Sequence, residues 1–94
     1  MKRQRNWMQQ LLESADLPAE ALPGLPVIEV CADQRVLIEH HLGICQYGST
    51  EITVKVAFGW VRITGEALKL ACMTKEKLVI RGKLQGLEII RRNG

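Results

Sequence analysis

The chain has 94 residues, of which 47% are hydrophobic and 24% charged, a composition typical of one folded domain with no room in it for a separate catalytic domain. Its net charge of +3 is concentrated near the two ends, in Lys2, Arg3 and Arg5 and in Arg91 and Arg92. A nucleic-acid-binding domain usually carries cations along one face with aromatic stacking partners, so we expect no nucleic acid as a ligand.

The cysteines and the hydropathy pattern indicate where the protein resides. Cys31, Cys45 and Cys72 are odd in number and include no CxxC pair, and the N-terminus lacks the apolar core of a secretory signal. We therefore expect reduced, buried thiols in a cytoplasmic protein. No apolar run approaches the roughly 20 residues that span a bilayer, so any membrane association should be peripheral.

Residues 1–17 are predicted to form an amphipathic helix. Its apolar residues fall on one stripe with a helical period, and polar residues occupy the other side. The stripe consists of Trp7, Met8, Leu11, Leu12 and Ala15. Pro18 disfavours helical geometry in the residue before it and should end the helix, and the proline-rich residues 18–26 should form an extended linker.

From residue 27 to residue 94 the period changes to two, which predicts an all-β domain. The segment "TEITVKVAF" alternates between apolar and polar residues, as a half-buried strand does. Further short strands are expected at Val27–Cys31, Arg35–Glu39, Trp60–Thr64, Leu68–Cys72, Leu78–Arg81 and Leu84–Ile90. Since no sequence is left for crossover helices, we predict an antiparallel meander that forms a small sandwich or an open barrel.

Gly48, Gly65 and Gly82 are spaced by 17 residues, which leaves a short β-solenoid as the alternative architecture. The last two follow the similar pairs Ile-Thr and Ile-Arg, but the surroundings of Gly48 differ. Solenoids usually need at least three repeats, so two similar hairpins are the favoured interpretation. In hairpins, the three glycines would permit structural turns or bulges that a Cβ would obstruct.

The stretch "EHHLGIC" is the best candidate for chemistry, because it holds His40, His41 and Cys45 close together. On a strand, however, adjacent histidines point to opposite faces, and the spacing matches no usual zinc pattern. A thiolate pair of Cys45 with His41 would lack an orienting carboxylate in the nearby sequence. We therefore expect no catalytic residue, metal or cofactor, and keep a metal- or thiol-dependent enzyme or sensor as an alternative.

Two other features are better candidates for contacts with a partner. Trp60 and Arg62 share the strand face opposite to Val61, so their side chains should project outward if Val61 packs inward. Trp7 and Leu11 belong to the apolar stripe of the predicted helix, which can dock on a partner, on a membrane or on the chain's own sheet. These four residues are the predicted partner contacts.

Three motifs of the β region carry a family resemblance. They are "IEHHLGI" at residues 38–44, followed by Tyr47, the "G-x-V-x-I-x-G-x-x-L" run at residues 59–68 and the "L-x-I-x-G-x-L-x-x-L" run at residues 78–87. Through them, residues 25–89 resemble the YabP/YqfC family of sporulation proteins, and its YqfC branch in particular. The family pattern more often has Glu-Asn-His where this chain has Glu39, His40 and His41. That difference weakens any argument for a role of the paired histidines.

The resemblance implies a small protein made in the mother cell during endospore formation. It would act with a membrane-embedded partner, as YqfC does with YqfD and YabP with YabQ, and could lie peripherally at the outer forespore membrane. The family has no assigned enzyme activity or cofactor. We therefore expect a non-enzymatic interaction module with a YqfD-like partner and no small-molecule substrate. Exposed strand edges leave a self-assembling structural protein, a homo-oligomer, as a further alternative.

Overall fold

The computed structural model describes residues 24–92, and this part of the chain is all-β, as predicted. Its strands are β1 (Val27–Cys31), β2 (Arg35–Glu39), β3 (Ile44–Tyr47), β4 (Glu51–Val56), β5 (Gly59–Met73) and β6 (Lys77–Arg91). The predicted helix at residues 1–17 and most of the predicted linker lie outside the described residues.

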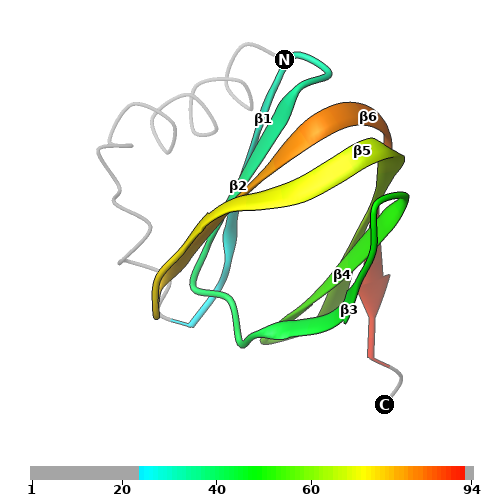
Figure 1. The fold of residues 1–94 in the computed structure, drawn as a ribbon. Helices are drawn as coiled ribbons and strands as arrows, with labels where there is room; N and C mark the ends of the chain where they lie inside the picture. The colour runs from blue at the N-terminus through cyan, green and yellow to red at the C-terminus, as the bar shows by residue number, and fades with distance from the viewer. Residues whose placement is uncertain (1–23, 93–94) are drawn as a thin grey trace, which may run out of the picture.

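The six strands form one antiparallel sheet with the order β1-β2-β6-β5-β4-β3. The long hairpin of β5 and β6 lies in the middle, with the β1–β2 hairpin beside β6 and the β3–β4 hairpin beside β5 (Figure 1). The predicted meander is wrong in its connectivity, because the chain passes from β2 to the far edge of the sheet. The antiparallel pairing of every neighbouring strand also excludes a solenoid for residues 24–92, because the strands of a β-helix are parallel.

The sheet curls around one hydrophobic core (Figure 1). On β4, Ile52, Val54 and Val56 are fully buried and alternate with more exposed residues, which confirms the strand predicted from "TEITVKVAF". The rest of the core consists of Val36, Ile38, Val61, Ile63, Leu68, Leu78 and Ile80. Burial of one such aliphatic side chain contributes roughly 1.5–3 kcal/mol, so this core is the main source of the domain's stability.

β5 and β6 are each 15 residues long, whereas the sequence predicts two short strands in place of each. Their pairing shifts register between Thr64 and Gly65, between Glu66 and Lys69, and between Leu70 and Cys72. Bulges of this kind bend a strand and change which side chains face inward without ending the ladder. In sequence, the interrupted alternation is therefore indistinguishable from two strands joined by a turn.

Gly65 and Gly82 lie inside these strands, and of the three equally spaced glycines only Gly48 lies in a loop. A Cβ on Gly65 would collide with the carbonyl oxygen of Lys83, and a Cβ on Gly82 would lie 2.8 Å from the carbonyl oxygen of Ala67. Gly82 also has a φ of 151°, which other residues rarely adopt. The two glycines thus allow close approach of β5 and β6. They are not turn residues, but Gly65 lies at one of the register shifts, where the sequence allowed for a bulge.

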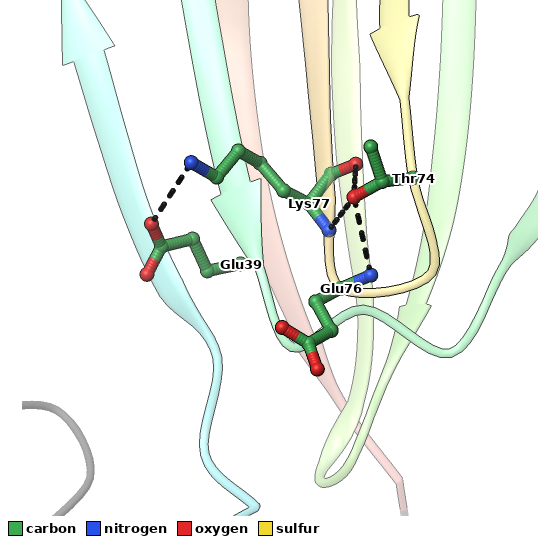
Figure 2. A network of polar contacts seen from close by, with 4 residues as sticks. All are labelled: Glu39, Thr74, Glu76 and Lys77. Carbon is green, nitrogen blue, oxygen red and sulfur yellow. Dashed lines mark hydrogen bonds and ion pairs between the residues drawn. The ribbon is translucent and has the colours of Figure 1, made fainter.

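The turn between β5 and β6 is held by its own polar groups. Thr74 Oγ1 accepts hydrogen bonds from the main-chain nitrogens of Glu76 at 3.3 Å and Lys77 at 3.1 Å (Figure 2). Lys77 Nζ also lies 3.9 Å from Glu39 Oε2 on β2. The main-chain nitrogen of His40 donates to the carbonyl of Glu76 at 2.7 Å, so the connection that follows β2 is fixed to this turn.

Candidate interaction surface

The stretch with the paired histidines is a structural connection between β2 and β3. His41 is only 8% exposed, with Nε2 2.9 Å from the carbonyl oxygen of Thr74 and Nδ1 3.0 Å from the main-chain nitrogen of Gly43. Because the Gly43 N–H donates to Nδ1, the neutral tautomer has its proton on Nε2, which donates to Thr74. Both ring nitrogens are therefore engaged by main-chain groups.

His40 and the cysteines are not grouped with His41 as metal ligands. His40 has a φ of 64° and lies in the connection, not on a strand, so the opposite-face argument for the pair does not apply. Among residues 24–92, no group of three or more His, Cys, Asp or Glu side chains is placed to hold a metal ion.

The thiols are exposed, whereas the sequence interpretation has them buried. Cys31, Cys45 and Cys72 are free and exposed. Cys31 and Cys72 pair with Arg35 and Val79, which face away from the core, and Cys45 lies on the edge strand β3. Strand β3 itself is absent from the prediction, because its four residues, "ICQY", are too few to show an alternation.

Trp60 and Arg62 point away from the core, as predicted, because Val61 between them is fully buried. Arg62 lies between carboxylates of both neighbouring strands. Its Nη1 donates to Glu88 Oε1 on β6 at 3.1 Å, and its Nε forms an ion pair with Glu51 Oε2 on β4 at 3.3 Å without hydrogen-bond geometry. Arg62 thus joins three strands within the domain.

Trp60 is likewise engaged within the domain. The guanidinium carbon of Arg92 lies 5.7 Å from the centre of the Trp60 ring, within the range of a cation–π contact. Trp60 and Arg62 remain predicted partner contacts, but each already has a partner inside the sheet. The other two predicted contacts, Trp7 and Leu11, lie outside the described residues.

The second half of β6 forms an edge of the sheet that sequence reasoning does not identify. β2 pairs with β6 from Lys77 to Arg81, and the last contact on that side is the hydrogen bond from the Leu84 nitrogen to the Asp33 carbonyl, at 2.7 Å. Beyond Leu84, β6 pairs with β5 alone among the strands of residues 24–92. Within residues 24–92, the other side of this half-strand has no neighbour.

The peptide groups along this edge follow from the pairing with β5. The main-chain nitrogen of Arg92 donates to the carbonyl of Phe58 at 2.8 Å, so residue 92 directs its peptide groups toward β5. Alternate residues of an antiparallel strand face opposite neighbours. The N–H and C=O groups of Leu87, Ile89 and Arg91 therefore point to the free side, where another strand can pair with them.

An apolar groove of about 220 Å³ adjoins this edge. It lies between β6 and the end of the β1–β2 hairpin, and its apolar lining consists of Val30, Ala32, Val36, Leu84 and Leu87. Val30 is 52% exposed, and Ile89, which follows Leu87 on the same face of β6, is also 52% exposed. The free edge thus combines unpaired peptide groups with apolar side chains that are incompletely covered.

The corresponding edge of β5 is more fully covered. Beyond Gly65, β4 no longer pairs with β5, but the Leu68 nitrogen donates to the Ser49 carbonyl at 2.8 Å and the Leu70 nitrogen donates to Tyr47 Oη at 3.1 Å. The half-strand of β6 has no such side-chain contact among the described residues. In the sequence, the free edge of β6 is marked only by the closely spaced apolar residues Leu87, Ile89 and Ile90. A strand buried in the core would show the same pattern.

Comparisons with known proteins identify no relative. No family model, no curated protein and no solved structure matches the chain. Among residues 24–92, no helix is long and apolar enough to cross a membrane.

Proposed function

We propose that the protein is a non-enzymatic, β-rich interaction module that works with a membrane-embedded partner during endospore formation. The biological setting rests on the resemblance of residues 25–89 to the YabP/YqfC family, which makes a YqfD-like protein the expected partner. The module would act in the mother cell, peripherally at the outer forespore membrane, with its N-terminal amphipathic helix as an additional contact.

The observation that carries the proposal is the unpaired half of β6 beside the apolar groove. An extended segment of the partner would add to the sheet by hydrogen-bonding to Leu87, Ile89 and Arg91. Alternate side chains of that segment would enter the groove beside Val30 and Leu84 and provide specificity. Strand addition needs no reactive side chain on this chain. This agrees with the motifs at residues 59–68 and 78–87, whose apolar residues and glycines build the sheet and its core.

Co-purification of the YqfD-like membrane protein with Ile89→Lys tests this surface. A lysine at this exposed position places a charge on the edge, which disfavours pairing with another strand, and we expect at least a tenfold loss of captured partner. Met73→Lys is the matched control, because Met73 is similarly exposed, at 45%, at the end of β5 and outside the proposed surface. Capture by Ile89→Lys at the level of Met73→Lys would overturn the proposed surface.

The same edge also favours a second candidate, self-assembly of the chain. Two copies that pair their β6 edges would form an oligomer without any other partner. Light scattering of the purified chain distinguishes the two, since self-assembly predicts an oligomer that Ile89→Lys converts to a monomer. A wild-type monomer that still captures the membrane protein would leave strand addition by the partner as the function of the edge.

A further inference from the structure

Three cations lie side by side on the outer face of the sheet, away from the β6 edge. Arg81 of β6 pairs directly with Arg35 of β2 on one side and with Lys69 of β5 on the other. All three residues are exposed. Directly opposite residues on neighbouring strands share a face with their Cβ atoms about 5 Å apart, so this cationic row places three positive charges in a line across β2, β6 and β5.

The row has no acidic partner among residues 24–92. The ion pairs of this part of the chain join Arg62 to Glu51 and Glu88, and Lys77 to Glu39. Like charges directly opposite each other destabilise a sheet. The same sheet places Arg62 between two carboxylates, whereas Arg81 lies between two cations. An arrangement that is unfavourable in the free protein becomes favourable when an anion binds to it.

A hollow at one end of the row has room for such an anion. It has a volume of about 520 Å³ and is lined by residues of the β1–β2 turn together with Arg35, Arg81, Gly82 and Lys83. Lys83 adds a fourth exposed cation next to the row. Asp33 contributes the one carboxylate of this lining, so three positive charges face a single negative charge.

We propose that the cationic row and its hollow form a binding site for phosphate-class oxyanions. The forked guanidinium groups of Arg35 and Arg81 suit the bidentate recognition of phosphate oxygens, and Lys69 and Lys83 add charge on either side. Phospholipid headgroups and soluble phosphates share this chemistry. The hollow and the groove beside the β6 edge share Asp33 of the β1–β2 turn, but none of the four cations lines the groove. The site does not depend on the proposed partner.

Titration of the ¹⁵N-labelled full chain with inorganic pyrophosphate at constant ionic strength tests the site by amide chemical shifts. We expect saturable shifts at residues 81–83, and about fivefold weaker binding in Lys69→Gln. Lys55→Gln is the matched control, because Lys55 is an exposed lysine of β4 outside the row and its substitution removes the same charge. Asp33→Asn should strengthen binding, since it removes the one carboxylate of the hollow.

Sedimentation with vesicles of phosphatidylglycerol and phosphatidylcholine, compared with vesicles of phosphatidylcholine alone, distinguishes the two sources of phosphate. Binding to the anionic vesicles that Lys69→Gln weakens more than Lys55→Gln supports the site with a headgroup as its ligand. Binding of pyrophosphate alone, with the same difference between the variants, supports it with a soluble ligand. Equal losses in the two lysine variants, or no binding of either probe, would overturn the proposal.

Discussion

At the scale of single residues, His41 has a structural role, although the "EHHLGIC" stretch around it suggests a metal or thiol site. Its imidazole joins the Gly43 nitrogen, 3.0 Å from Nδ1, to the Thr74 carbonyl, 2.9 Å from Nε2. These contacts connect the β2–β3 loop to the β5–β6 turn, which lies 33 residues away in sequence. The sequence shows two adjacent histidines but cannot show that one of them is surrounded by main-chain groups.

His41→Ala should lower the free energy of unfolding by about 2 kcal/mol, because it leaves two main-chain polar groups without their partner in a largely buried site. Urea denaturation followed by circular dichroism measures this loss. His40→Gly is the matched control and should be neutral or slightly stabilising, since glycine adopts the φ of 64° at that position without strain. A loss in His41→Ala no larger than in His40→Gly would contradict the structural role.

At the scale of elements, the equally spaced glycines differ in what they do. Gly65→Ala would bring a Cβ against the main chain of β6, and we expect a loss of about 3 kcal/mol. Gly48→Ala should change stability by less than about 0.5 kcal/mol, because the nearest atom to its Cβ would be the Glu51 carbonyl oxygen at 3.5 Å. Thermal denaturation of both variants measures the difference. Similar losses of stability in the two variants would contradict this difference and would indicate that Gly48 and Gly65 occupy equivalent positions of a structural repeat.

The strands that follow a clean alternation could be predicted from the sequence, and those that depend on long-range pairing could not. β2 has the predicted bounds and β4 buries its predicted residues, because in each of these strands one buried face determines the pattern. β1 also has the predicted bounds, although its burial does not alternate. The continuity of β5 and β6 depends on bulges whose register is set by the facing strand. The free edge of β6 could not be predicted from the sequence either. Whether Ile89 is exposed depends on the order of the strands in the sheet, which decides if another strand lies beside it.

At the scale of the whole molecule, the distribution of charge matters more than the net charge of +3. The sheet carries two arginines in opposite environments, both on its outer face. Arg81 lies between two cations, Arg35 and Lys69, whereas Arg62 lies between two carboxylates. Substitution of either arginine by glutamine removes one positive charge, so the two variants have the same net charge. The glutamine that replaces each arginine is still polar.

Arg81→Gln should raise the melting temperature at low ionic strength, and Arg62→Gln should lower it. Two unit charges about 5 Å apart in water repel by about 0.8 kcal/mol, and Arg81 has two such neighbours, so the unreduced repulsion is about 1.6 kcal/mol. Solvent exposure and flexible side chains reduce it, so we expect a gain of about 1 kcal/mol in Arg81→Gln. Added salt screens both effects and should bring the two variants together. Thermal denaturation across a range of sodium chloride concentrations measures the convergence. A shift of the same sign in both variants would mean that net charge, and not the placement of each arginine, determines the electrostatic contribution to stability.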